Sequence, residues 1–237
     1  MNFLTAKWIN LVMANYEISP EILQPYIPGG TALYFYHGRT FVSLVGFMFL
    51  DTKIFGIPIP GFGSFEEINL RFYVIRKDKN QIKRGVVFIN ETVPFRQVAW
   101  IANKLYKEHY TSIPTRHEWL ITESKKIINY YWMMNKNWNH LQTSTSTGSD
   151  PILLGSIEEF IFEHYWGYTG AYNSDTTEYE VFHPSWNVNK VETYSIDCDF
   201  VSMYGRDFEI LSHQKPSTVL VAEGSPISVK WKRTKIT

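Results

Sequence analysis

The chain has 237 residues, with 23 Lys and Arg side chains against 23 Asp and Glu, so its formal net charge at pH 7 is zero. This balance argues against a protein that binds nucleic acid or an anionic membrane surface, because such proteins carry a basic excess. Hydrophobic residues make up 44% of the chain and charged residues 19%, which excludes extensive disorder. The single cysteine, Cys198, permits no internal disulfide.

Neither the N-terminal residues nor the most apolar stretch indicates a secreted or membrane protein. Residues 1–6 lack the basic region and the long apolar run of a signal peptide. The most apolar stretch, residues 41–50, is too short to span a bilayer. We therefore expect a soluble, cytoplasmic protein.

Strands dominate the predicted elements, because aromatic residues make up 16% of the chain and often occur beside β-branched ones. Turn residues such as His37-Gly38 and Asp78-Lys79-Asn80 separate the successive runs, and short connections of this kind imply antiparallel neighbours. In the first half of the chain the predicted strands cover residues 8–16, 32–36, 40–55, 67–77 and 81–93. In the second half they cover residues 118–121, 127–134, 179–182, 188–200 and 219–231, with the polar tract 143–150 as a loop.

Two helices are predicted from prolines. Ser19 is a good N-cap and Pro20 occupies the first helical position of a short helix that ends before Pro28. Pro94 opens a longer helix, whose apolar residues recur at the spacing of one helical face. This stripe must pack on the sheet, and its members are Val98, Ile101, Ala102 and Leu105.

A third helix begins at Ser156, which forms the S-x-x-E capping box with Glu159. A fourth segment, residues 203–211, is a weaker helix because Gly205 lies inside it. No shift in composition marks a domain boundary. We therefore expect one domain over residues 1–237, of the α+β class, built on a curled, mostly antiparallel sheet with a few packed helices.

Two neighbouring predicted strands carry charged residues that are candidates for a site. Glu91 is predicted to share a strand face with Val87, Ile89 and Val93, which places its carboxylate on a side that faces a core or a cavity. The preceding strand presents Glu67 and Arg71, with Glu66 beside them. A guanidinium between carboxylates holds an acidic ligand or, alternatively, pins the sheet as a structural ion pair. Both interpretations remain open at this point.

Histidines supply further candidates, but none of the seven shows metal-ligand spacing, so neither a metal nor a cofactor is expected. Arg116 and His117 lie in one short ionisable segment before a strand. His164 ends the third predicted helix, where it could act as a general acid or base or simply be stabilised as a cation by the helix C-terminus. Cys198 alternates with apolar residues and is predicted in the core rather than as a nucleophile.

Five ordered segments between about Phe3 and Trp231 resemble the YqjF-like family of uncharacterised conserved bacterial proteins. They are VSLVGF at 42–47, FEEINLRFYV at 65–74, RGVVF at 84–88, EHYWGY at 163–168 and AEGSP at 222–226. That family is distantly similar to the acetoacetate decarboxylase superfamily. The resemblance implies a cone- or barrel-like antiparallel sheet curled around a central pocket.

The chemistry of that superfamily uses a lysine that forms a Schiff base with a keto acid. The resemblance aligns Glu91 with a glutamate that precedes this lysine, and Glu66 or Glu67 with an earlier acidic residue. The lysine itself is missing after Glu91, where the sequence reads TVPFR, and arginine forms no imine. Other lysines stand elsewhere: Lys104 and Lys107 in a predicted helix, and the pair Lys125-Lys126 between strands.

Three functions follow. The first is a pocket protein that binds or acts on a small carboxylate or carbonyl compound without Schiff-base chemistry, with Arg96 or Arg116 as a further carboxylate ligand. The second is a non-catalytic binding or interaction module whose pocket is filled by side chains, with Glu91 buried against Arg71. The third, a minority interpretation, is a Schiff-base decarboxylase that uses Lys104, Lys107 or Lys126. The candidate pocket residues are Glu66, Glu67, Arg71, Glu91, Arg96, Arg116, His117 and His164.

Exposed strand edges and many aromatic residues also make a homo-oligomer an expectation, with no symmetry implied by the sequence.

Overall fold

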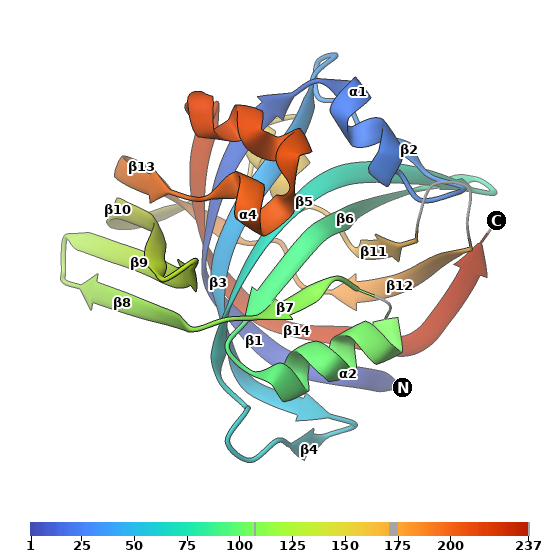
Figure 1. Cartoon of the computed structure of the whole chain (residues 1–237), viewed down its shortest axis with the longest axis horizontal. Helices are drawn as coiled ribbons and strands as arrows, with labels where there is room; N and C mark the ends of the chain where they lie inside the picture. The colour runs from blue at the N-terminus through green and yellow to red at the C-terminus, as the bar shows by residue number, and fades with distance from the viewer. Residues whose placement is uncertain (107, 171–174, 237) are drawn as a thin grey trace.

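The computed structural model describes residues 1–106, 108–170 and 175–236, and strands dominate it (Figure 1). Within these residues the strands form one 14-stranded sheet. Seven of its strands pair in a closed ring, and β6 and β11 are the only parallel neighbours in this ring. In ring order they are β1 (Asn2–Ile18), β3 (Thr40–Ile54), β5 (Phe65–Asp78), β6 (Gln81–Val93), β11 (Trp166–Thr169), β12 (Thr176–Phe182) and β14 (Thr218–Ile236).

The two ends of the chain close this barrel. Asn2 of β1 pairs with Lys230 of β14, and the antiparallel pairing continues to Asn15 and Thr218. The long strand β1 can follow the curve of the barrel because its register with β3 is irregular between Ile9 and Val12, which lets the strand bend. The expected curled, mostly antiparallel sheet with a few helices is therefore confirmed.

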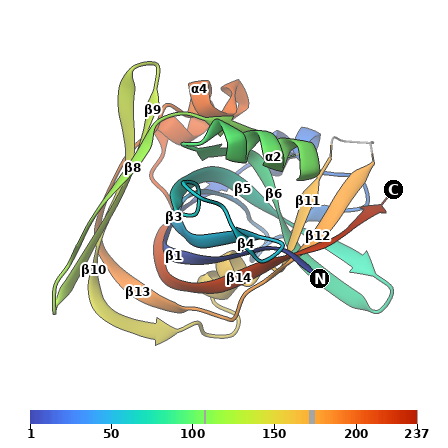
Figure 2. The same ribbon diagram turned by 90° about the horizontal axis from the view of Figure 1, so that it is seen from below.

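A curved arm of the same sheet continues beyond β14 (Figure 2). It consists of β13 (Asn187–Asp197), β10 (Asn137–Pro151), β9 (Lys125–Met134) and β8 (Thr115–Ile121). The prediction of a loop over residues 143–150 is wrong, because Thr143 and Thr145 are buried and pair with β9 on one side and β13 on the other. Threonine is β-branched and fits a pleated strand despite its hydroxyl group. Three short strands complete the sheet: β2 (Ala32–Leu33), β4 (Ile57–Pro58) and β7 (Tyr110–Ser112).

The helices lie where capping residues predicted them, with one difference. Ser156 accepts a hydrogen bond from the Glu159 amide and begins α3 (Ile157–Phe162). The predicted helix over residues 203–211 is instead divided at Gly205, whose φ of 98° interrupts the helical path between α4 (Phe200–Tyr204) and the 3₁₀ helix η2 (Arg206–His213). The other helices are α1 (Pro20–Leu23), the 3₁₀ helix η1 (Gln24–Tyr26) and α2 (Arg96–Tyr106). None of the helices in the described ranges is long and apolar enough to cross a bilayer.

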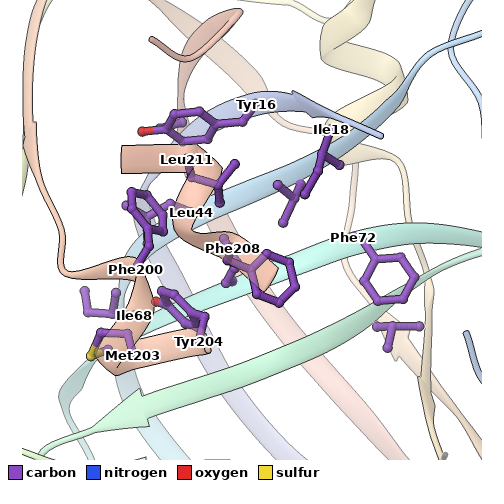
Figure 3. Packing of buried hydrophobic residues seen from close by; sticks show 14 of the residues in the cluster. Tyr16, Ile18, Leu44, Ile68, Phe72, Phe200, Met203, Tyr204, Phe208 and Leu211 are labelled. Atoms are coloured by element: carbon purple, nitrogen blue, oxygen red, sulfur yellow. The ribbon is translucent and has the colours of Figure 1, made fainter. Parts of the chain in front are cut away.

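The strands β1, β3 and β5 bury both of their faces. Helices α4 and η2 pack on the outer face, where Phe200, Tyr204, Phe208 and Leu211 meet side chains such as Phe72 of the sheet (Figure 3). The inner face forms a second apolar cluster inside the barrel. Burial on both sides explains why β3 reads as an almost continuous apolar run rather than as an alternating one.

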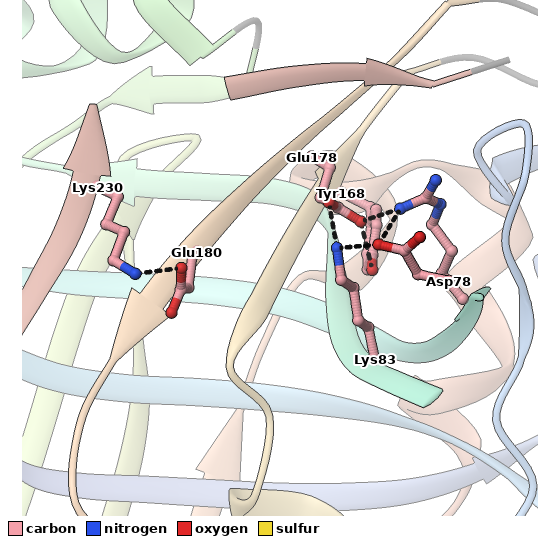
Figure 4. A network of polar contacts seen from close by, with 7 residues as sticks. Asp78, Lys83, Tyr168, Glu178, Glu180 and Lys230 are labelled. Carbon is pink, nitrogen blue, oxygen red and sulfur yellow. Dashed lines mark hydrogen bonds and ion pairs between the residues drawn. The ribbon is translucent and has the colours of Figure 1, made fainter. Parts of the chain in front are cut away.

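An ion-pair network fastens the β5–β6 hairpin to β12 (Figure 4). The buried Glu178 carboxylate lies 2.8 Å from Arg76 Nη1 and 2.7 Å from Lys83 Nζ, and it accepts a hydrogen bond from the Tyr168 hydroxyl at 3.1 Å. Lys83 also contacts Asp78 at 2.8 Å. The network joins strands on either side of the short β11 and so helps to hold the ring closed.

Candidate functional site

A cavity of about 160 Å³ lies inside the barrel. Its wall comes from the inner faces of the ring strands, from α2 and from the segment after α3. Most of the wall is apolar and aromatic, because alternate residues of each strand point inward. The aromatic residues include Trp8, Phe47, Phe49, Phe65, Phe88 and Trp186.

Two carboxyl groups meet at a tyrosine in this cavity. Glu67 of β5 and Glu91 of β6 are buried, and the strand register places Glu91 opposite Asn69, so the two glutamates are diagonal neighbours on the inner face. Glu67 accepts hydrogen bonds from Asn69 Nδ2 at 3.0 Å and from the Tyr110 hydroxyl at 2.9 Å. Tyr110 also pairs with Glu91 in the strand register, and Glu91 Oε2 is buried without a partner. The cavity predicted beside Glu91 is therefore present.

A third carboxyl group, Glu108, enters the cavity from the connection between α2 and β7. Its Oε1 accepts a hydrogen bond from the Tyr179 hydroxyl at 2.7 Å, and its Oε2 is buried without a partner. Tyr179 reaches this position by lying on Gly167, where an added Cβ atom would come within 2.1 Å of the tyrosine ring. Glycine at position 167 is thus required for the contact between Tyr179 and Glu108.

Burial raises the pKa of all three carboxyl groups, and neighbouring carboxylates raise those of Glu91 and Glu108 further. Burial raises the pKa of Glu67 to about 7, although its two hydrogen bonds oppose the shift. Burial raises the pKa of Glu108 to about 8. The pKa of Glu91 lies well above its ordinary value, because burial and then the charges of Glu108 and Glu67 disfavour its ionised form. Near neutral pH the cluster therefore retains protons rather than carrying three negative charges.

Another part of the cavity wall carries an arginine and a histidine. Arg71 Nη2 donates to the Ile161 carbonyl at 3.2 Å, whereas its Nε is buried without a partner. His164 is 6% exposed, and both of its ring nitrogens lack a partner. Burial, and then the charges of Arg71 and Arg84, hold the pKa of His164 well below its usual range. The histidine is therefore neutral, and the interpretation of a helix C-terminus that stabilises its cation is wrong.

His183 supports this part of the wall. Its ring stacks between Trp186, at 4.2 Å between centroids, and Tyr165, at 4.8 Å. Its Nε2 lies 3.2 Å from the His164 carbonyl oxygen and fixes the backbone beside the unpartnered imidazole. Burial lowers the pKa of His183 as well.

The structure brings together four of the eight candidate residues and separates the others. Glu67, Arg71, Glu91 and His164 line the cavity. Arg71 does not stand between the carboxylates as an ion-pair partner: within the described residues no salt bridge joins it to a glutamate, because its guanidinium turns toward the Ile161 carbonyl. The interpretation in which Arg71 pins the sheet as a structural ion pair with Glu91 is corrected by this geometry.

Glu66 and His117 form a separate contact on the outer face of the barrel. The Glu66 carboxylate accepts from Thr115 Oγ1 at 2.7 Å and lies 2.5 Å from His117 Nδ1. This arrangement joins β8 of the arm to β5. Residues 66 and 67 point to opposite faces of one strand, so only one of them can line the cavity.

Arg96 and Arg116 do not line the cavity either. Arg96 is exposed at the start of α2. The exposed Arg116 guanidinium packs over the rings of Tyr131 and Trp138, each 4.6 Å away. The expectation that either arginine holds a carboxylate in the pocket is therefore wrong.

No lysine is among the described residues of the cavity wall. Lys104 lies 4.8 Å from the centroid of the exposed Trp100 ring, and Lys126 contacts Glu223 at 3.2 Å. Lys107 lies outside the described residues. The nucleophile of a Schiff-base mechanism thus has no candidate in the described part of this wall.

Two further expectations concern metals and the cysteine. The described residues contain no group of three or more His, Cys, Asp or Glu side chains arranged to hold a metal ion. Cys198 packs against the outer core, and burial raises the pKa of its thiol well above the usual value. A thiol with a raised pKa is a poor nucleophile, in agreement with its predicted place in the core.

Sequence reasoning missed Glu108, Tyr110, Tyr179 and His183. Glu108 and Tyr110 follow a helix in a short connection, where no periodicity indicates a direction for the side chains. Tyr110 does begin a β-prone triplet, Tyr-Thr-Ser, and recognising it as a strand beside β6 would have placed its side chain next to Glu91. No local signal relates Tyr179 to Glu108, since the contact depends on barrel closure.

Solved structures share this fold. An acetoacetate decarboxylase-like enzyme from Sphingomonas wittichii RW1 matches with a TM-score of 0.65 and 11% identity, over 100% of this chain and 94% of that one. The enduracididine biosynthesis enzyme MppR complexed with pyruvate matches with a TM-score of 0.66 and 9% identity, over 100% and 91% of the two chains. Acetoacetate decarboxylase from Legionella pneumophila matches with a TM-score of 0.63 and 10% identity, over 100% and 90%. At such identities these matches establish a common fold.

Sequence comparison identifies the family. The uncharacterized protein YqjF of Bacillus subtilis strain 168 is 23% identical over 192 residues, which are 78% of this chain and 74% of that protein. The resemblance carried by the five segments is thereby confirmed. The model of the family DUF2071, described as an uncharacterized conserved protein, matches residues 5–226, and the chain belongs to this family.

Proposed function

We propose that the chain binds a small, mostly apolar molecule with a carboxylate or carbonyl group in the barrel cavity and acts on it without a Schiff base. One observation carries the proposal: buried polar atoms without a partner converge on one cavity. They are Arg71 Nε, Glu91 Oε2, Glu108 Oε2 and both ring nitrogens of His164. A buried polar group without a partner destabilises the folded protein by about 1–3 kcal/mol. A ligand that supplies the missing hydrogen bonds would remove this cost and so bind more tightly.

The size of the cavity limits the ligand. A cavity of about 160 Å³ is close to one of roughly 150 Å³ that holds benzene. The ligand therefore has roughly six to eight non-hydrogen atoms. The aromatic wall favours an apolar body on this small molecule.

The unpartnered polar atoms form two groups, one suited to a ligand carboxylate and the other to a ligand carbonyl oxygen. Arg71 carries the positive charge in the wall, and a ligand carboxylate near it would accept from the guanidinium Nε and from a neutral His164. The protonated carboxyl groups of Glu91 and Glu108 can donate to a carbonyl oxygen. A 2-keto acid combines both groups, and pyruvate, the molecule bound by the structural relative MppR, is the simplest probe of this class.

Calorimetric titration with pyruvate and with longer 2-keto acids tests the proposal. We expect saturable binding that Arg71→Gln weakens at least tenfold, because the charge that holds the carboxylate is lost. Glu66→Gln is the matched control, since Glu66 lies on the outer face of the same strand, and its affinity should equal that of the wild type. Absence of binding for the whole series, or equal losses in both variants, would contradict the proposal.

Borohydride reduction in the presence of pyruvate tests the chemistry. Because no lysine is among the described wall residues, we expect the protein mass to be unchanged after reduction. A covalent adduct would overturn the lysine-free mechanism, and peptide mapping would then show which lysine, Lys107 included, carries it.

A further inference from the structure

The three carboxyl groups of the cavity differ in their hydrogen bonds. Both oxygens of Glu67 accept from protein donors, the Asn69 amide and the Tyr110 hydroxyl. Glu91 and Glu108 each leave one buried oxygen without any partner. Hydrogen-bond donors favour an ionised carboxylate, whereas an oxygen without a donor favours the protonated form. The geometry therefore assigns the negative charge to Glu67 and protons to the other two.

We propose that the cavity enolises its carbonyl ligand: the Glu67 carboxylate removes a proton from the carbon next to the carbonyl group, and the Glu91 carboxyl group protonates the carbonyl oxygen. This inference rests on the proposed function and specifies its reaction. The strand register supports it, because diagonal neighbours such as Glu67 and Glu91 stand roughly 7–8 Å apart, and somewhat less at their Cβ atoms. Both carboxyl groups line the same cavity, so a small ligand there can reach the two of them.

The step balances without an external reactant. The C–H bond breaks and its electron pair becomes the carbon–carbon double bond of the enol, while the carbonyl π pair takes the proton from Glu91. Glu67 is then protonated and Glu91 is ionised. The Tyr110 hydroxyl donates to Glu67, and the strand register pairs Tyr110 with Glu91, so this hydroxyl can pass a proton from Glu67 to Glu91 and restore the starting state. Tyr110 is thus the group that connects the acid and the base.

The charges around the pair keep base and acid available at one pH. Burial raises the pKa of Glu67 only to about 7, because the two hydrogen bonds and then the nearby Arg71 charge oppose it. The pKa of Glu91 lies well above its ordinary value, because of burial and then the charges of Glu108 and Glu67. The other titratable groups that face the cavity are Tyr110, Tyr179, Glu108, His164 and His183. An ionised carboxylate beside a neutral carboxyl group is the arrangement that general acid–base catalysis needs near neutral pH.

Deuterium exchange in D₂O, followed by proton NMR on pyruvate and 2-oxobutanoate, tests the inference. We expect the wild type to exchange the hydrogens at C3 faster than buffer does. Glu67→Gln and Glu91→Gln should each lower the enzymatic rate by about 10²–10⁴-fold, the usual contribution of a general acid or base. Calorimetric affinity for the same keto acids should change less than tenfold, since Arg71 still holds the carboxylate.

Tyr110→Phe is the second variant, because it keeps the ring and both glutamates but removes the connecting hydroxyl group. We expect a lower exchange rate with binding retained, whereas Glu66→Gln should exchange like the wild type. A keto acid that binds but exchanges at the buffer rate would overturn the enolisation and leave the proposed binding intact. Failure to bind would overturn the proposed function instead. Exchange undiminished in the Glu67→Gln, Glu91→Gln double variant would overturn the assignment of acid and base.

Discussion

The outer and inner faces of β5 present the same side chain in opposite situations. Glu66 on the outer face is provided with two partners, Thr115 and His117, in a contact between strands. Glu67, the next residue, faces a cavity in which neighbouring Glu91 and Glu108 have unpartnered oxygens. The two glutamates are adjacent in the sequence, but strand alternation places their carboxylates on opposite faces of the sheet, with different surroundings. Glu66 and Glu67 both have two hydrogen-bond partners, so the difference between the two faces lies in the neighbours of Glu67: their unpartnered oxygens indicate a place for a ligand.

The apolar surroundings of the two faces differ in the same way. On the outer face α4 and η2 cover the barrel strands with side chains such as Phe208, which is fully buried (Figure 3). On the inner face the aromatic side chains leave a space of about 160 Å³. Close packing is the rule in protein interiors, so a cavity of this size with convergent polar groups is a departure that function explains.

The largest expected effect breaks the outer core. Phe208→Ala should lower the free energy of unfolding by about 3–5 kcal/mol, because a fully buried phenylalanine is removed and its surroundings relax only partly. Urea denaturation monitored by circular dichroism measures the loss. The affinity for a 2-keto acid should remain within twofold of the wild type, since Phe208 lies outside the barrel cavity.

Phe49→Ala is the matched variant of the inner face. Phe49 lines the cavity and stacks on Phe65 at 4.8 Å between ring centroids. Its removal should cost less stability than Phe208→Ala, because part of its ring already borders empty space, and it should change the range of keto acids that bind. A larger stability loss for Phe49→Ala than for Phe208→Ala would refute the distinction between a packed face and an open one.

A smaller effect concerns the pH dependence of stability. The raised pKa of Glu108, about 8 against an ordinary value of 4.5, means that the folded state binds a proton more tightly than the unfolded state. Stability contributed by this proton is fully present below about pH 4.5 and is lost as the pH rises toward 8. Glu108→Gln removes the ionisation, so its stability relative to the wild type should increase between pH 5 and 8.5, by a few kcal/mol in order of magnitude.

Comparison of the wild type with Glu108→Gln separates the effect of Glu108 from that of the histidines, which change stability with pH in the opposite direction. His164 and His183 have lowered pKa values, so they reduce stability as the pH falls through about 6.5, where the unfolded chain takes up protons. These histidines remain in both proteins and cancel in the difference. Parallel urea-denaturation curves at pH 5, 7 and 8.5 provide the measurement, and a difference that does not change with pH would contradict the raised pKa of Glu108.

Local patterns predicted part of this arrangement. The predicted face shared by Glu91, Val87 and Ile89 is interrupted by a bulge: Val87 and Ile89 pack in the outer cluster, whereas Glu91 lines the cavity with Val86 and Phe88. The S-x-x-E pattern located the start of α3 at Ser156, because it depends only on neighbours in the chain. By contrast, the loop predicted over residues 143–150 failed because pairing with two other strands outweighed a polar composition.

The rest of the site depends on contacts between distant parts of the chain. The barrel closes where Asn2 pairs with Lys230, and no local pattern relates these positions. Tyr179 reaches Glu108 because β11 and β12 pair onto β6, far along the chain. Arg71 was expected beside Glu91, but its guanidinium finds the Ile161 carbonyl, a group that the sequence pattern does not locate. Alternation thus predicts which way a side chain points only where no bulge interrupts the strand, and contacts between distant strands determine what it meets.

The smallest expected effect sharpens the contrast between adjacent glutamates. Glu66→Gln keeps the shape of the side chain and an oxygen that accepts from Thr115, but it removes the charge beside His117. We expect a loss of about 1 kcal/mol in the free energy of unfolding, the net value of an ordinary hydrogen bond. Keto-acid affinity and deuterium exchange should equal those of the wild type. Equal activity losses in Glu66→Gln and Glu67→Gln would mean that the two faces of β5 are coupled, and the assignment of function to the inner face would then be wrong.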